Sequence, residues 1–264
     1  MILKILFIGD IIGKSGRRAI KYLLPNIIDK NNIDIVIANG ENAAGGFGIT
    51  RVISHELFDS GIDIITTGNH VWNKKETEGF ICEENKVLRP ANYPDNVPGG
   101  GSIVYNSIIG EKVGVINISG RVFMEPLECP FRVVQEKISL IEKETKNIIV
   151  DFHAEATSEK MAMGWFLDGK VSAVVGTHTH VQTSDERIFP KGTGYITDVG
   201  MTGSFDSVIG IKKDKAIKKF LTQIPQKFEV AKNDIRFQGA VIDIDSENGK
   251  CVDIYRITVK LKER

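Results

Sequence analysis

The strongest constraint on the fold is a repeated order of a short apolar run, a loop and an amphipathic helical segment. Residues 2–8 form a β-rich run, and residues 17–30 then carry apolar side chains at helical spacing. The order recurs in residues 34–38, which precede a helix that begins near Thr50, and residues 63–67 form a third apolar run. These units predict an α/β fold with a buried sheet, in which ligands bind at the carboxyl ends of the strands.

Later segments predict further strands, some of them antiparallel. Residues 101–118 predict a hairpin that turns at Gly110 and Glu111. The remaining predictions are a helix over 131–146, strands over 147–152 and 171–175, and a C-terminal hairpin formed by 228–244 and 250–261. No long linker or internal repeat interrupts the chain, so the sequence predicts a single domain over residues 1–264.

The charge balance excludes classes of partner. Lys and Arg together number 34, and so do Asp and Glu, so no overall field attracts nucleic acid or an anionic membrane. No apolar run approaches the roughly 18 residues that a transmembrane helix requires. Cys82, Cys129 and Cys251 show no metal-finger spacing, and we therefore expect reduced thiols in a cytoplasmic protein. The sequence leaves the formation of a homo-oligomer open.

Histidines gather at the ends of the predicted strands. Of the five in the chain, four lie at or just after a strand end, namely His70, His153, His178 and His180, whereas His55 lies in a predicted helix. A single histidine of this kind could be a core residue with a backbone partner. Together they favour a metal site, because neutral imidazole is a common ligand of Zn, Fe and Mn.

Carboxylate and amide side chains follow the same strands. Asp10 follows the first buried run with no basic residue before Lys14, and Glu41 lies in a Gly-rich loop. A buried carboxylate is costly unless a cation or hydrogen-bond donors compensate for it, so both residues strengthen the metal prediction. Other roles stay open, because Asp10 could cap a helix and Asn42 and Asn69 could form turns.

Two nucleotide-binding motifs do not fit the first loop. The segment GDIIGKS at residues 9–15 has three residues between its glycines, whereas a P-loop has four. No G-x-G-x-x-G pattern follows Ile8, which excludes a Rossmann fingerprint. An anionic ligand would therefore need another kind of local site.

In their order along the chain, these motifs resemble those of the calcineurin-like metallophosphoesterases. The shared features are GD at Asp10, NGEN at Glu41, GNH at Asn69, then His153, then GTHTH at His178. The segments IANGENAAGGFGIT, GNHVWNKKE, RPANYP, DFHAEATSEK and VVGTHTHVQT are similar to the YmdB-like branch, and the resemblance covers most of the chain. The chain departs from the broad superfamily pattern at Ile12, where a His is usual, and at Glu41, where a bridging Asp is usual. Both departures are features of that branch.

The resemblance implies a sandwich of two β-sheets flanked by helices, with two divalent or trivalent metal ions at the carboxyl ends of the strands. Mixed nitrogen and oxygen ligands favour Fe or Mn and also suit Zn. The implied ligands are Asp10, Asn42 and His180 for one cation, Asn69, His153 and His178 for the other, and Glu41 as the bridge. The resemblance further implies that His70 donates a proton to the leaving alkoxide, a role that suits an imidazole near neutral pH.

The implied function is a two-metal hydrolase of phosphoesters. The resemblance favours a phosphodiesterase that acts on 2′,3′-cyclic nucleotides through a metal-bridging hydroxide, so a small phosphoester is the expected partner. Two alternatives stay open. One is a phosphomonoesterase, because the same metal site can serve monoesters. The other is a metal-dependent, nucleotide-binding regulatory protein with weak turnover.

Overall fold

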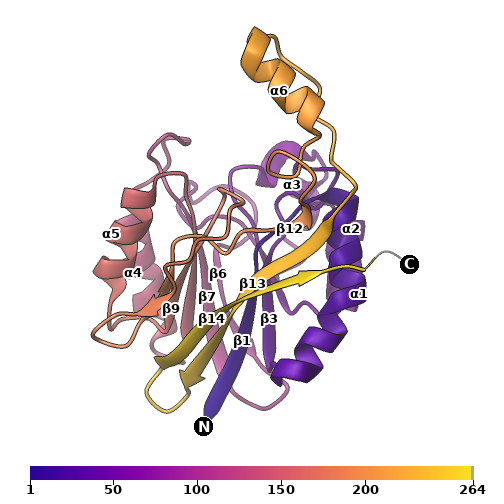
Figure 1. Cartoon of the computed structure of the whole chain (residues 1–264). Coiled ribbons are helices and arrows are strands. Elements are labelled where there is room, and N and C mark those ends of the chain that lie inside the picture. The colour runs from indigo at the N-terminus through magenta and orange to yellow at the C-terminus, as the bar shows by residue number, and fades with distance from the viewer. Residues whose placement is uncertain (263–264) are drawn as a thin grey trace.

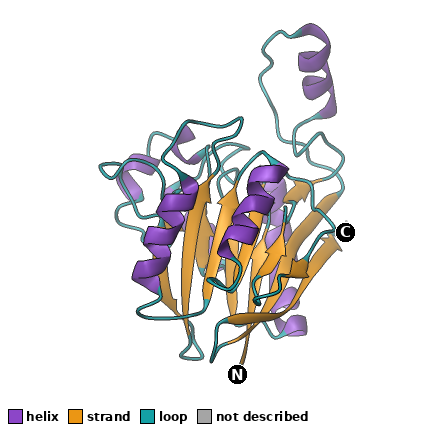
Figure 2. Cartoon of the chain, turned by 90° about the vertical axis from the view of Figure 1, so that its left-hand side faces the viewer, coloured by secondary structure: helices purple, strands orange, loops and turns teal. Residues whose placement is uncertain are grey.

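The computed structural model describes residues 1–262, and the strands of this region form two sheets that share one core (Figures 1 and 2). The first sheet contains β1 (Ile2–Ile8), β2 (Asp10–Ile11), β3 (Ile35–Asn39), β4 (Ile64–Thr66), β5 (Val87–Leu88), β12 (Met201–Ser204), β13 (Ile235–Asp245) and β14 (Lys250–Lys260). The second contains β6 (Ser102–Asn106), β7 (Lys112–Ser119), β8 (Ile148–His153), β9 (Ala173–Thr177), β10 (Arg187–Ile188) and β11 (Gly194–Ile196).

Strand β1 shows why the sheets stack. Its alternate residues Leu3, Ile5 and Phe7 are fully buried in the core that the two sheets share. The intervening residues Leu6 and Ile8 face the other way and belong to the core beneath the helices. A strand that is apolar on both sides must be covered on both sides, and this pattern places the first sheet in the interior of the molecule.

The helices form the outer layers (Figure 2). The helices α1 (Gly13–Asn31) and α2 (Arg51–Asp59) pack on the first sheet, and α4 (Pro130–Ile141) and α5 (Thr157–Leu167) pack on the second. The shorter elements are η1 (Val71–Asn73) and α3 (Thr77–Phe80). The predicted α/β sandwich of two sheets flanked by helices is confirmed.

Parallel pairing brings several strand ends to one edge. In the first sheet β1, β3, β4 and β5 are parallel neighbours. In the second sheet β7, β8, β9 and β11 are parallel neighbours. All the candidate site residues lie at or just after the ends of β1, β3, β4, β8 and β9, as expected for ligands at the carboxyl ends of parallel strands.

Two predicted helix boundaries differ from the structure. The first helix begins at Gly13 rather than residue 17, because Gly13 adopts a φ of 51° that turns the chain directly into the helix. The helix predicted over 131–146 ends at Ile141, and the polar residues that follow offer no apolar face to bury. The predicted helix after Thr50 is confirmed, and the Thr50 hydroxyl caps it by accepting from Ile53 N at 3.3 Å.

The C-terminal hairpin is also shorter than predicted. Its first strand, β13, begins at Ile235 rather than at residue 228. Residues 205–231 instead form an arm that contains α6 (Lys213–Thr222) and projects beyond the sandwich (Figure 1). Val230 and Ile211 pair through an isolated bridge at the base of this arm. Across residues 1–262, every helix is too short or too polar to cross a bilayer.

Candidate metal centre

The structure brings all eight predicted site residues together at one edge of the sandwich. Asp10 is the first residue of β2, His153 is the last residue of β8, and the others lie in the loops after β3, β4 and β9. A cavity of about 290 Å³ opens onto this edge, and its walls include Glu41, Asn42, His70, His178 and His180. Asp10 and His153 lie behind these walls and are fully buried, whereas Asn69 is half-buried.

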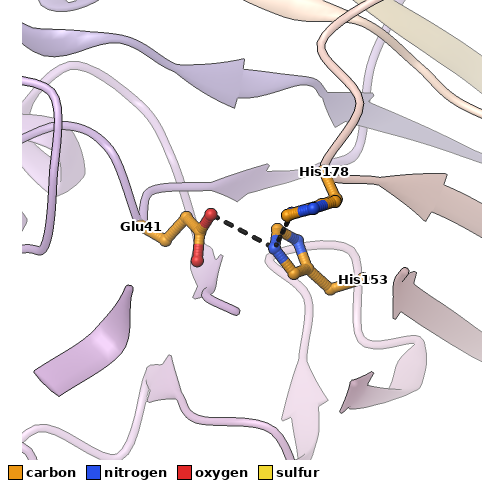
Figure 3. A group of neighbouring side chains, drawn as sticks. All are labelled: Glu41, His153 and His178. Carbon is orange, nitrogen blue, oxygen red and sulfur yellow. Dashed lines mark hydrogen bonds and ion pairs between the residues drawn. The ribbon is translucent and has the colours of Figure 1, made fainter. Parts of the chain in front are cut away.

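One group of donors surrounds His153. Its Nε2 lies 3.0 Å from Asn69 Oδ1, 3.0 Å from His178 Nδ1 and 3.1 Å from Glu41 Oε1. Figure 3 shows Glu41, His153 and His178 directed toward one another. Adjacent ligands at right angles around a metal, each about 2.1 Å from it, lie about 3.0 Å apart. The spacing of this group therefore fits the coordination sphere of a cation.

A second group lies on the other side of Glu41. His180 Nε2 is 3.5 Å from Asp10 Oδ1 and 3.3 Å from Asn42 Nδ2. Asn42 Nδ2 is also 3.2 Å from Glu41 Oε1, and rotation of the amide would present its oxygen at the same place. Glu41 Oε1 is thus within 3.2 Å of a member of each group.

Each of the three histidines in the two groups has one ring nitrogen held by a partner outside these groups. Its other ring nitrogen is therefore directed inward. The partners are Thr177 Oγ1 at 2.8 Å from His153 Nδ1, Glu155 Oε2 at 3.1 Å from His178 Nε2, and the Ile209 carbonyl at 3.0 Å from His180 Nδ1. Metal-binding histidines are usually oriented in this way by a hydroxyl, carboxylate or carbonyl. The backbone of His178 and His180 is also unusual, with φ of 98° and 64°. Such conformations persist where the surroundings enforce them.

The burial and charge of the two carboxylates show whether the site suits cations. Asp10 and Glu41 are both fully buried, and Asp10 Oδ1 has no hydrogen-bond partner among the described residues. Burial alone would raise both pKa values, yet the imidazoles of His180 and His153 bring the pKa of Asp10 below its ordinary value, and His153 does the same for Glu41. Two buried negative charges with an unsatisfied oxygen fit a centre that holds cations.

The pKa values of the imidazoles shift in opposite directions. Burial would lower the pKa of each, but Asp10 raises the pKa of His180 to about 9, and Glu41 raises that of His153. Burial and the neighbouring His153 lower the pKa of His178 to about 3. Asp10 and Glu41 thus favour the protonated forms of His180 and His153 in the protein alone. Bound cations would take over that charge and release the protons.

The sequence prediction missed a buried ion pair beneath the His178 loop. Lys160 Nζ donates to Asp198 Oδ2 and to the Thr177 carbonyl, both at 2.7 Å. Asp198 Oδ2 also accepts from Thr179 N at 3.1 Å and Thr179 Oγ1 at 2.7 Å. The pair therefore fixes the backbone on both sides of His178.

Helical periodicity could have revealed Lys160. It is 1% exposed and shares a buried stripe of α5 with Met163, Gly164 and Leu167. That spacing is typical of an apolar helix face, and a lysine within it needs a buried partner.

Close packing behind His153 also escaped prediction. A Cβ on Gly68 would lie 2.2 Å from His153 Cδ2, so a glycine is required for the ring to reach its position. Thr177 Oγ1 donates to Asp151 Oδ1 at 2.7 Å, and burial raises the pKa of Asp151 to about 7. Gly68 and Asp151 lie within the GNH and DFHAEATSEK segments, but neither residue has a role of its own in the sequence prediction.

A two-sheet sandwich with this donor set at the carboxyl ends of its strands defines a metal-dependent phosphoesterase of the calcineurin-like fold. The sequence model of a family described as "YmdB-like protein" matches residues 6–257, and the chain belongs to that family. The resemblance noted in the sequence is confirmed.

Similar proteins cover nearly the whole chain. A Bacillus subtilis protein named 2′,3′-cyclic-nucleotide 2′-phosphodiesterase is 50% identical over 257 residues, which are 97% of this chain and 97% of that protein. The crystal structure of a hypothetical protein from Thermus thermophilus has a TM-score of 0.91 and 42% identity, covering 98% of this chain and 99% of that one. The crystal structure of a novel phosphatase from Mycoplasma pneumoniae has a TM-score of 0.92 and 35% identity, covering 98% and 94%.

Proposed function

We propose that the chain is a phosphodiesterase that hydrolyses 2′,3′-cyclic nucleotides at the 2′ ester bond. The observation that carries this proposal is the position of Glu41 Oε1, which lies between two groups of nitrogen and oxygen donors. A centre for two cations suits a phosphodiester, because the substrate is an anion whose charge would otherwise repel a nucleophile. The substrate class rests on the name of the Bacillus subtilis relative, which is 50% identical to this chain.

The proposed ligand sets follow the two groups of donors. Asp10, Asn42 and His180 would hold one cation, Asn69, His153 and His178 the other, and Glu41 would contact both. When bound, the cations would neutralise the phosphoryl oxygens and lower the pKa of a water molecule. We propose Mn or Fe as the metals, with Zn as a compatible third choice, because the donors are imidazole, carboxylate and amide groups without a thiolate. We also propose the cytoplasm as the location of the enzyme.

His70 is the proposed proton donor. Its backbone N–H donates to Glu41 Oε2 at 2.9 Å, which ties the loop after β4 to the centre of the site. Its ring lines the cavity beside His178 and His180. Cleavage of the bond between phosphorus and O2′ leaves an alkoxide that needs a proton. An imidazole in this position can supply it, and the product is then a 3′-monophosphate with a free 2′-hydroxyl.

The proposal is tested with Mn-loaded protein and 2′,3′-cyclic AMP. Chromatography should show 3′-AMP as the product, and chelation should abolish its formation. The rate on p-nitrophenyl phosphate, a monoester, should be lower, and the reverse order of rates would favour a phosphomonoesterase. His55→Ala is a matched control, because its side chain is 58% exposed on α2, and it should keep full activity. An Mn-loaded protein that leaves the cyclic nucleotide intact would overturn the proposal.

A further inference from the structure

Two aromatic rings stand over the cavity that contains the metal centre. Phe47 follows the Glu41 loop, and Phe228 lies in the returning segment of the 205–231 arm. Both line the cavity together with His70. Their ring centroids are 6.5 Å apart, and the ring planes differ by only 21°. Nearly parallel rings at a cavity wall are the arrangement that stacks on planar ligands.

The separation of the rings suits one inserted base. A planar base between two parallel rings needs about 6.8 Å, which is twice the spacing of about 3.4 Å between stacked bases. The ring centroids are 6.5 Å apart, which is slightly less than that value, so the rings must separate a little to admit a base. An outward displacement of the Phe228 ring by a few tenths of an ångström would bring the centroid separation to that value.

The base of the arm is anchored close to both aromatic rings. Ser15 Oγ donates to the Ala231 carbonyl at 2.6 Å. Val230 packs so closely over Gly13 and Gly46 that a Cβ on either glycine would lie 3.0 Å or 2.9 Å from a Val230 methyl group. Gly46 directly precedes Phe47, and Val230 follows Phe228 by two residues. The same contact therefore keeps the two segments that carry the rings next to each other.

The position of His70 connects the rings to the reaction. The ring of Phe47 contacts that of His70 edge to face, with centroids 4.9 Å apart. In a 2′,3′-cyclic nucleotide, the leaving O2′ is on C2′ and the base is on the neighbouring C1′. A substrate whose O2′ faces His70 must therefore place its base close to Phe47.

We propose that Phe47 and Phe228 form a nucleobase clamp, which selects nucleoside cyclic phosphates over diesters without a base. The proposal rests on the proposed function for its substrate. The clamp holds the base by stacking on both faces, and since every base has a π-face it tolerates several bases. Lys219 Nζ lies 4.8 Å from the centroid of the Phe228 ring and supports that ring from the arm.

The kinetic test compares 2′,3′-cyclic AMP with ethylene phosphate, a five-membered cyclic diester that has neither ribose nor base. Phe228→Ala should lower kcat/KM for 2′,3′-cyclic AMP by about 5- to 100-fold, mainly through KM, because alanine removes one stacking partner. The same variant should leave turnover of ethylene phosphate within about twofold of the wild type. Phe228→Tyr should restore stacking, and Phe220→Ala should resemble the wild type, because Phe220 is 72% exposed on α6. Equal losses on both diesters, or none, would overturn the clamp.

A second measurement separates the clamp from catalysis. Saturation-transfer NMR with adenosine on metal-free protein should show contact at the base protons H2 and H8. This contact should be lost in Phe47→Ala and Phe228→Ala and retained in Phe220→Ala. If adenosine contacts the protein in this way but the wild type does not hydrolyse the cyclic nucleotide, the clamp stands and the proposed function fails. If hydrolysis occurs and the base protons show no contact, the clamp fails alone.

Discussion

Replacing Lys160 by Met tests whether a buried ion pair holds the loop of His178 and His180. The substitution keeps an unbranched side chain of similar length and removes the ammonium group. Asp198, which is fully buried, then loses its only cationic partner among the described residues. Its carboxylate retains donors from Thr179 and from Gly200 N, the latter at 2.8 Å.

Removing one member of a buried ion pair costs about 3–5 kcal/mol, because a charge is left in the interior without compensation. The remaining donors to Asp198 should keep the loss near the lower limit, at about 3 kcal/mol. Lys112→Met is the matched control. Lys112 pairs with Glu144 at 3.0 Å, but the side chains are 44% and 53% exposed, so the expected loss is below about 1 kcal/mol.

The free energy of unfolding is measured by urea denaturation of chelator-treated protein, so that bound metal does not contribute. Metal affinity, measured by competition with a chromophoric chelator, is the second readout. We expect Lys160→Met to weaken it by about 10- to 100-fold, because Lys160 supports the backbone that carries two ligands. If Lys160→Met loses no more stability than Lys112→Met and binds metal like the wild type, the pair does not position the loop.

Three further experiments, two with variants and one with a thiol reagent, have distinct expected results. His70→Ala should retain bound metal and lose about 10²–10⁴ in rate on substrates with an alkoxide leaving group, and a smaller factor with p-nitrophenolate; equal losses on the two would remove His70 from the role of acid. Glu41→Ala should lower the metal content measured by mass spectrometry, because the lost carboxylate is shared by both donor groups, and an unchanged content would argue against its bridging role. Burial raises the pKa of the Cys251 thiol to about 12, so at pH 8 iodoacetamide should label exposed Cys82 far faster than Cys251; comparable labelling would contradict the packing around β14.

The order of strands and loops in the sequence revealed the candidate residues, because the carboxyl ends of parallel strands lie at one edge of a sheet. Asp10, Glu41 and His153 each lie at such an end, so strand prediction alone brought them near one another. The alternative role of Asp10 as a helix cap is wrong, since Ile12 occupies the cap position of α1 and makes no side-chain capping bond.

The arm and the support of the site could not be predicted in the same way. Residues 228–234 share the alternation of the strand that follows, but the arm leaves the sheet before Ile235. Phe220 and Leu221 are 72% and 79% exposed on α6, so the arm does not follow the rule that apolar helix faces are buried. The partner of Lys160 is 38 residues away in sequence, and such a contact exists only in the folded chain.

The most direct test of the central claim is an anomalous-scattering map from crystals of protein loaded with Mn. Two peaks about 3.5–4 Å apart should flank Glu41, one in contact with Asp10 and His180 and the other in contact with His153 and His178. A map without a peak within bonding distance of Glu41 would contradict the two-metal centre and the hydrolysis proposed for it.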